Sequence, residues 1–196
     1  MKLRQGALFI FAFVAHGETI TFDTLPKTVI EDRLRSVVAK NSEREQALRD
    51  LLVQAGCPIG RLEEQAVKHS KIPNVLCTMP GQISAVIIVG AHFDCVSAGC
   101  GVVDNWSGAS LLPSLLESLK KIPRRHTFTF AGFSDEEKGM IGSRYFVGVL
   151  SQEDVENISA MINIDSVGAG PTKLELDRGT RSLANALWTN TTIHTG

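Results

Sequence analysis

The stretch VIIVGAHFD (residues 86–94) decides the fold class of this chain. It opens with four β-branched apolar residues, as a strand buried on both faces of a parallel sheet does, and it closes on polar side chains. The stretches HTFTFAGFSDEE (126–137) and AMINIDSVG (160–168) repeat this pattern. Polar groups at these positions are costly to bury unless something pairs with them. They are His92, Asp94, Glu136, Glu137 and Asp165.

The ends of these three runs predict a metal site. In an open α/β sheet, the carboxyl ends of parallel strands meet at one edge, and binding sites form just beyond that edge. The segment VVDNWSG (102–108) lies between the first two runs and adds Asp104 to the same set. Several carboxylates in one place repel each other unless a cation lies among them. The sequence therefore favours a metal centre beyond the strand ends.

Strand-like and helix-like segments alternate along the chain, which predicts an α/β fold with a mixed, mainly parallel sheet covered on both faces. We divide it into a helical N-terminal region with a first strand (18–73) and a main domain (74–196). Ser42 and Glu45 form a predicted capping box for the second helix. The predicted helices are 26–40, 42–55, 107–120, 139–150 and 180–189, and the predicted strands are 62–68, 74–79, 84–91, 126–133, 159–165 and 172–177.

The composition narrows the class of protein. With 196 residues, of which 43% are hydrophobic and 21% charged, the chain is long enough to bury one sizeable core. The net charge is −1 at pH 7, and the sequence has no run of Lys and Arg. Nucleic-acid-binding proteins rely on such basic stretches, so we expect no nucleic-acid partner.

Residues 1–17 have the pattern of a secretory signal peptide. Lys2 and Arg4 precede the apolar run GALFIFAFVA, and AHG (15–17) offers a small-x-small cleavage pattern. The run is too short to span a bilayer comfortably. We expect a secreted or periplasmic protein without membrane contact after cleavage; the alternatives are a buried first strand or an uncleaved anchor.

The four cysteines fit an oxidising compartment. Two disulfides, Cys57–Cys77 and Cys95–Cys100, are compatible with the order of the predicted elements. Cys95 and Cys100 lie between two candidate metal ligands, so the alternatives are free thiols or metal ligation by this pair. A lone C-x₄-C pair is a weak zinc signal, which favours a disulfide or free thiols.

The spacing of the polar residues suggests roles for them. His92 and Asp94 are two residues apart in an extended segment and so face the same side, where one can bind a metal while the other orients it. Glu136 and Glu137 suit a division of labour, in which one carboxylate binds the metal and the other takes a proton from water.

Each of these residues, taken singly, also has a purely structural interpretation. Asp104 before Ser-Gly is a common helix N-cap. Glu136 and Glu137 fit a solvated acidic turn, and Asp165 fits a solvated strand end. The metal interpretation rests on the set, because every member falls at the same edge of the predicted sheet.

Four blocks, GAHFD, VVDNWSGAS, FSDEEKGMIGSRYFV and NIDSVG, resemble in order and spacing the co-catalytic zinc peptidase family of secreted bacterial leucyl aminopeptidases. Glutamate carboxypeptidase and glutaminyl cyclase are relatives of that family. The resemblance covers about residues 74–170. It implies a three-layer α/β/α sandwich of the phosphorylase/hydrolase-like zinc peptidase architecture, and a peptide as substrate.

The same resemblance implies roles at matching positions. Asp104 is expected to bridge two zinc ions about 3.5–4 Å apart, Asp94 to orient a ligating imidazole, and Glu136 to act as the general base. Mn²⁺ or Co²⁺ could also occupy the carboxylate-rich positions. The positions that match zinc ligands are His92, Asp104, Glu137 and Asp165.

The chain departs from the family pattern after Asp165. The family supplies a final zinc-binding His near its C-terminus, whereas only 31 residues follow Asp165 here and His194 arrives too early in register. The chain therefore resembles the first two-thirds of such a domain, C-terminally truncated, with a second metal position that is incomplete. We expect a zinc aminopeptidase; the alternatives are a glutaminyl-cyclase-like transferase and a non-catalytic binding domain that keeps the peptidase fold.

Overall fold

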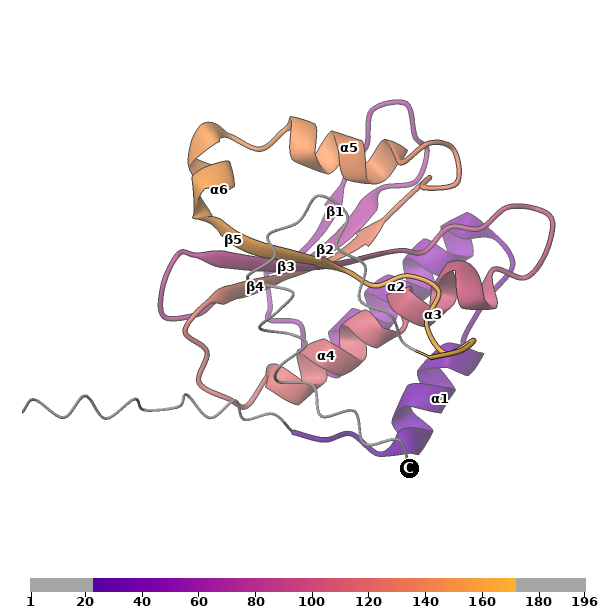
Figure 1. Ribbon diagram of the computed structural model, residues 1–196, viewed down its shortest axis with the longest axis horizontal. Coiled ribbons are helices and arrows are strands. Elements are labelled where there is room, and N and C mark those ends of the chain that lie inside the picture. Colours follow the sequence, from indigo (N-terminus) through magenta and orange to yellow (C-terminus); the bar gives the residue numbers. More distant parts are fainter. Residues whose placement is uncertain (1–22, 172–196) are drawn as a thin grey trace, which may run out of the picture.

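The computed structural model describes residues 23–171, which form a five-stranded sheet with helices on both faces (Figure 1). The strand order is β1-β2-β4-β3-β5. β3 lies parallel to β4 and β5, whereas β2 is antiparallel to both β1 and β4. The predicted α/β fold with a mixed sheet is thus confirmed. The strands are β1 (Leu62–Gln65), β2 (Asn74–Met79), β3 (Val86–His92), β4 (Thr127–Phe133) and β5 (Ile158–Asn163).

The helices form two layers around this sheet, as the three-layer prediction requires (Figure 1). One face is covered by α5 (Ile141–Gly148) and α6 (Gln152–Asn157). The helices on the other face are α1 (Lys27–Arg35), α2 (Asn41–Ala55), α3 (Ser107–Ala109) and α4 (Leu111–Leu119), and a helical turn, η1 (Val102–Trp106), leads into α3.

Burial of apolar side chains between the layers holds the sheet in place. Leu48 and Leu52 of α2 are fully buried and share one core cluster with Leu112 and Leu116 of α4. Each fully buried Leu contributes about 1.5–3 kcal/mol of transfer free energy relative to an exposed one. A smaller cluster beneath α5 contains Phe133 and Phe146, whose rings meet edge to face at 5.7 Å. Both faces of β3 and β4 are therefore covered, which explains their apolar composition.

Some of the predictions about helices are wrong, among them the end of the first helix, since α1 ends at Arg35 rather than at residue 40. α2 begins at Asn41 rather than Ser42 and has no side-chain cap, so the predicted capping box does not form. Asn41 instead exchanges hydrogen bonds with the backbone of Cys95: its Nδ2 donates to the carbonyl at 3.1 Å, and its Oδ1 accepts from the amide at 3.0 Å. α6 was not predicted, because Val155 is the one apolar residue among its six and forms no apolar stripe; Ser151 and Asp154 form its capping box.

The structure separates the four cysteines into two kinds. Cys57 and Cys77 form a disulfide that ties the end of α2 to β2, as predicted. Cys95 and Cys100 are free thiols, so the predicted second disulfide is absent and the alternative of free thiols holds. Cys95 Sγ lies 3.5 Å from Asn41 Oδ1, and Cys100 is exposed.

Several predictions fall outside the described residues: the signal peptide (1–17), the strand 172–177, the helix 180–189 and His194. The division between 18–73 and 74–196 stays a prediction. Within residues 23–171, no helix has both the length and the apolar character that crossing a bilayer requires.

The Cys57–Cys77 disulfide predicts a stability difference. Its partners are 20 residues apart, and a loop of this size contributes about 3 kcal/mol by restricting the unfolded chain. We expect the double variant Cys57→Ser/Cys77→Ser to lose about that free energy of unfolding in urea titrations. Cys95→Ser/Cys100→Ser, which removes two free thiols, serves as the control and is expected to change stability by under about 1 kcal/mol.

Candidate metal centre

Parallel pairing brings the ends of three strands to one edge of the sheet. His92, the last residue of β3, pairs with Phe133, the last residue of β4. On the other side of β3, Gly90 pairs with Asn163, and the Ile164 amide donates to the Gly90 carbonyl at 2.8 Å. Asp165 therefore leaves β5 beside His92. The expectation that these residues meet at the carboxyl edge is confirmed by this register.

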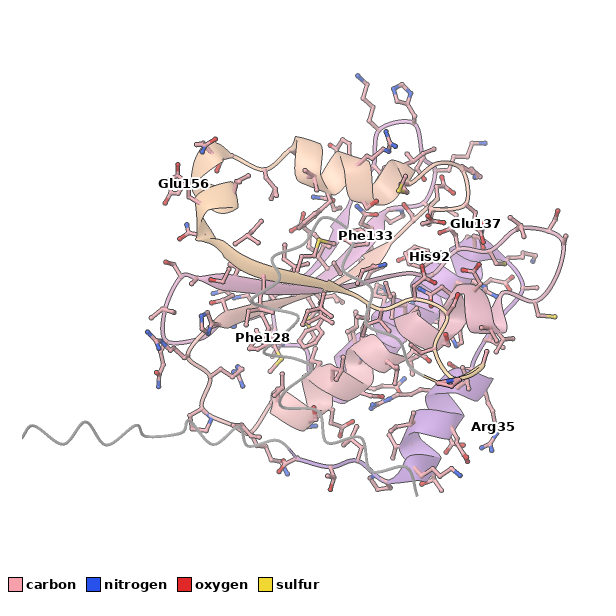
Figure 2. All side chains as sticks on the ribbon, in the orientation of Figure 1. Arg35, His92, Phe128, Phe133, Glu137 and Glu156 are labelled. Atoms are coloured by element: carbon pink, nitrogen blue, oxygen red, sulfur yellow. A yellow bond between two sulfur atoms is a disulfide. The ribbon has the colours of Figure 1, made fainter. Side chains whose placement is uncertain are left out.

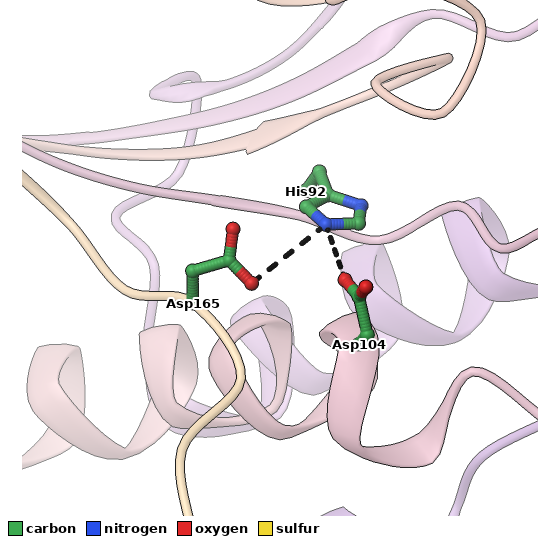
Figure 3. Close-up of side chains that lie close together, drawn as sticks. All are labelled: His92, Asp104 and Asp165. Atoms are coloured by element: carbon green, nitrogen blue, oxygen red, sulfur yellow. Dashed lines mark hydrogen bonds and ion pairs between the residues drawn. The ribbon is translucent and has the colours of Figure 1, made fainter. Parts of the chain in front are cut away.

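Three side chains converge at this edge (Figure 3). His92 Nε2 lies 3.0 Å from Asp104 Oδ1 and 4.0 Å from Asp165 Oδ1. Each of the three offers a ligand atom, and these atoms all lie within 4.8 Å of one another. The imidazole is only 3% exposed, whereas Asp104 and Asp165 are 61% and 46% exposed. The group is thus a buried nitrogen donor that faces two solvent-accessible carboxylates.

The two glutamates after β4 lie near this group but outside it. Glu136 Oε2 is 4.0 Å from His92 Nε2, and its side chain is 37% exposed. Glu137 follows on the same turn, and Figure 2 shows it on the side of the sheet edge where His92 lies. Burial and then the charge of Asp104 raise the pKa of Glu137 above its ordinary value. Glu137 is therefore close enough to the three-residue group for the negative charge of Asp104 to raise its pKa.

Asp94 is directed into the protein rather than into the group. It is 1% exposed and accepts hydrogen bonds from two backbone amides, those of Glu136 at 2.9 Å and Glu137 at 3.2 Å. Burial raises the pKa of Asp94, but His92 and these two amides outweigh that effect and hold it below its ordinary value. The Asp94 carboxylate therefore links the end of β3 to the turn after β4 through these two hydrogen bonds.

His92 carries a buried polar atom without a hydrogen bond. Its Nδ1 lies 3.4 Å from Asp94 Oδ1 but makes no hydrogen bond with any described residue. Burial lowers the pKa of His92, yet the carboxylate of Asp94, followed by those of Asp165 and Glu136, outweighs it and raises that pKa to about 9. The carboxylates around the imidazole therefore favour a positive charge at this position.

These observations fit a metal ion. Asp94, Asp104, Glu136 and Asp165 surround one imidazole, so the negative charges exceed what a single proton neutralises. A mixed nitrogen and oxygen donor set suits Zn²⁺, and its carboxylate-rich part also suits Mn²⁺ or Co²⁺. The donor atoms present therefore match the chemistry of a divalent cation.

Asn105 is a residue of this site that the sequence analysis did not single out. It is fully buried, its Nδ2 donates to the Ile164 carbonyl at 2.9 Å, and its Oδ1 accepts from the Ser166 amide at 3.2 Å. These two hydrogen bonds fix the backbone on both sides of Asp165. The Gly108 amide also donates to Oδ1, at 2.9 Å. The sequence does contain a signal for this role, because Asn105 directly follows Asp104. An amide side chain that is buried beside a candidate ligand needs several hydrogen-bond partners.

Known proteins share this arrangement of elements. A sequence model of peptidase family M28 matches residues 74–194, more than half of the chain. The chain belongs to peptidase family M28. This result confirms the resemblance drawn from the four sequence blocks. An aminopeptidase from Pseudomonas aeruginosa is 34% identical to this M28 chain over 103 residues, which are 52% of the chain and 19% of the relative. The match thus spans about a fifth of that relative's length.

Two solved structures resemble the M28 chain in fold. A glutaminyl cyclase from an Acidobacteriales bacterium superposes with a TM-score of 0.70 at 18% identity, covering 89% of this chain and 69% of the cyclase. A Zn-dependent exopeptidase from Parabacteroides distasonis superposes with a TM-score of 0.61 at 14% identity, covering 83% and 68%. At these identities the likeness concerns the fold alone.

The hydrogen bonds of Asn105 predict the effect of removing its side chain. Asn105→Ala leaves the Gly108 and Ser166 amides and the Ile164 carbonyl without this partner, so we expect a loss of about 1–3 kcal/mol in the free energy of unfolding. Asn157→Ala is the matched control, since Asn157 makes one surface hydrogen bond, to Ser84. Equal urea midpoints for the two variants would contradict the assigned role.

The raised pKa of His92 predicts a pH dependence in the metal-free chain. A group whose folded pKa of about 9 exceeds its ordinary 6.5 stabilises the fold below pH 6.5, and this contribution is lost as the pH rises through 9. We expect an NMR titration of the His92 ring, assigned by the signal missing in His92→Gln, to have a midpoint near 9. Asp94→Asn, which removes the strongest of the carboxylates that raise this pKa, is expected to lower the midpoint. A His92 midpoint near 6.5 would contradict the charge arrangement described above.

Proposed function

We propose that this M28 chain carries the zinc-binding part of a metallo-exopeptidase of the aminopeptidase type. The observation that carries the proposal is the convergence of His92, Asp104 and Asp165 at the carboxyl edge of the sheet. A zinc ion held there supplies a Lewis acid that polarises the scissile carbonyl and lowers the pKa of the attacking water. The name of the Pseudomonas aeruginosa relative supports the aminopeptidase class.

In this proposal the residues of the chain divide into donors and a base. His92, Asp104 and Asp165 would supply the donor atoms for a zinc ion, and Glu137 would supply a further carboxylate to the metal centre. Asp94 lies on the buried side of the His92 ring, with its Oδ1 3.4 Å from Nδ1, and attracts the ring through its charge. Asp94 is thus a positioning residue that leaves Nε2 directed toward the carboxylates.

Glu136 is the proposed general base. It lies outside the group of three donors, at 4.0 Å from His92 Nε2, and is partly exposed, so its carboxylate is free to take a proton from water. The two bonds from the Glu136 and Glu137 amides to Asp94 fix the turn that carries it. A carboxylate held beside the metal donors by its own backbone suits proton transfer, which requires hydrogen-bond reach.

The proposed substrates are peptides with a free N-terminus, encountered outside the cytoplasm. The formed Cys57–Cys77 disulfide fits an oxidising compartment, and the pattern of residues 1–17 fits export. The proposal therefore places the protein in a secreted or periplasmic setting.

A transferase acting on N-terminal glutaminyl residues is the second candidate. The observation that favours it is the compactness of the group, because three donors within 4.8 Å suit a single ion. A cyclase needs one Lewis-acidic ion and no attacking water, so the stoichiometry of bound metal separates the two candidates.

The Glu136→Gln variant tests the proposal. Loss of the base, with the donors intact, is expected to lower kcat for leucine p-nitroanilide by about 10²–10⁴-fold while zinc content and affinity stay within about threefold. Glu156→Gln is the control, because it is the same substitution at an exposed position on α6 (Figure 2). Zinc content is measured by atomic absorption after stripping with chelator and reloading.

Each outcome bears on one candidate. Two zinc ions per chain, with hydrolysis lost only in Glu136→Gln, supports the aminopeptidase. One zinc ion, with cyclisation of a glutaminyl peptide and no hydrolysis, supports the transferase. Zinc binding without turnover of either substrate leaves the non-catalytic binding domain as the conclusion for this chain.

A further inference from the structure

A single buried arginine holds the backbone on both sides of the loop that separates His92 from Asp104. Arg44 of α2 has no exposed surface. Its Nη1 donates to the Phe93 carbonyl at 3.2 Å and to the Gly101 carbonyl at 3.0 Å, and its Nη2 donates to the Cys100 carbonyl. Its Nε donates to the Val38 carbonyl at 2.7 Å. One guanidinium thus joins three separate stretches of backbone.

In the described part of the chain, the positive charge of Arg44 is stabilised by backbone carbonyls and an aromatic ring instead of by a carboxylate. Among residues 23–171, no carboxylate lies within ion-pair distance of its guanidinium, so the carbonyl dipoles and the face of Trp106, 5.7 Å from Cζ, are its partners. Burial of a charge without a counter-ion is costly, and an apolar side chain of the same size avoids this cost. An arginine at this position is explained by the backbone segments to which it donates hydrogen bonds.

The hydrogen bonds of Arg44 fall beside both metal-donor segments. Phe93 lies between His92 and Asp94, so its carbonyl directly follows the end of β3. Gly101 precedes η1, and its carbonyl also accepts from the Trp106 amide at 3.0 Å, which closes the turn that carries Asp104. The planar fork of the guanidinium therefore spans the two segments that present His92 Nε2 and Asp104 Oδ1.

The intervening loop, residues 95–100, has no strand or helix to hold its shape and is largely exposed. Asn41 holds its first residue through the Cys95 backbone, and Arg44, one turn along α2, holds its last residue through the Cys100 carbonyl. Gly101 has a φ of +49°, and a Cβ there would clash with Cys95 Cβ and lie 3.1 Å from Arg44 Nη1. The backbone is thus packed directly against the guanidinium.

We infer that Arg44 is a positioning residue of the metal centre, whose guanidinium sets the spacing between His92 and Asp104. The inference rests on the proposed function only in that these two residues bind metal. An arginine suits this task better than a lysine, because its donors are fixed in a plane and reach several acceptors at once, whereas an ammonium is a single point charge. The shape of the donor array, more than its charge, is what the metal centre depends on.

Arg44→Lys and Arg44→Met test this inference through zinc affinity, measured by competition with a chromophoric chelator. We expect both variants of the full chain to bind zinc about 10–100-fold more weakly than the wild type, the range that loss of a residue orienting metal ligands produces. The visible spectrum of the Co²⁺-loaded variants is expected to change as well, since it reports the geometry of the donors. Arg44→Lys keeps the charge and so isolates the planar fork.

Leu48→Ala is the matched control for a loss of stability. Leu48 lies one turn further along α2, is fully buried in the core, and its apolar side chain makes no hydrogen bond, so its truncation weakens the core and leaves the four hydrogen bonds of Arg44 in place. We expect the folded Leu48→Ala chain to bind zinc within about threefold of the wild type, with an unchanged Co²⁺ spectrum.

The outcomes separate the inference from the proposed function. Wild-type affinity and spectrum in folded Arg44→Lys would overturn the inference, as would an equal loss of affinity in Leu48→Ala. A wild-type chain that binds zinc but hydrolyses no peptide bond sinks the peptidase proposal, while weaker binding in Arg44→Lys would still support the inference. A wild-type chain that binds no zinc overturns both.

Discussion

The structure depends on the pairing of β3 with two parallel neighbours. Because β4 and β5 run in the same direction as β3, the residues that follow all three strands are brought to one edge of the sheet. Both faces of β3 must then be covered, which the helices on either side accomplish by burying apolar side chains. The register of this pairing, more than any single contact, decides that His92 and Asp165 are neighbours.

The chemistry of that edge follows from an imbalance of charge. Burial lowers the pKa of the His92 imidazole, but the carboxylates around it, Asp94 first, outweigh burial and raise that pKa to about 9. Asp94 contributes to this imbalance from inside the protein, where two backbone amides stabilise its charge. Asp104 and Asp165 contribute from the solvent side. A cation at this edge removes the imbalance, which is why a fold of this kind supports metal chemistry.

Much of the fold and of the candidate site was predictable, and the reasons differ from element to element. The run at 86–94 identifies β3 because a continuous series of β-branched residues has few alternatives. His92 and Asp165 follow from it, since residues after parallel strands share an edge. By contrast, α6 has no apolar stripe to reveal it, and the start of α2 at Asn41 reflects a tertiary contact with Cys95 that no local pattern encodes. Cys95 and Cys100 are close in sequence, yet closeness does not make a disulfide.

The sequence by itself determined the alternation of strands and helices, the apolar character of β3 and β4, and the residue types that meet at their ends. These properties are local, because periodicity and composition act within a few residues. The tertiary structure alone decided that Asn105 grips the backbone around Asp165 and that Arg44 spans from Phe93 to Gly101. Both side chains act through hydrogen bonds to carbonyl or amide groups far away in the chain. Every residue carries such groups, so no sequence pattern marks which of them a buried side chain will find.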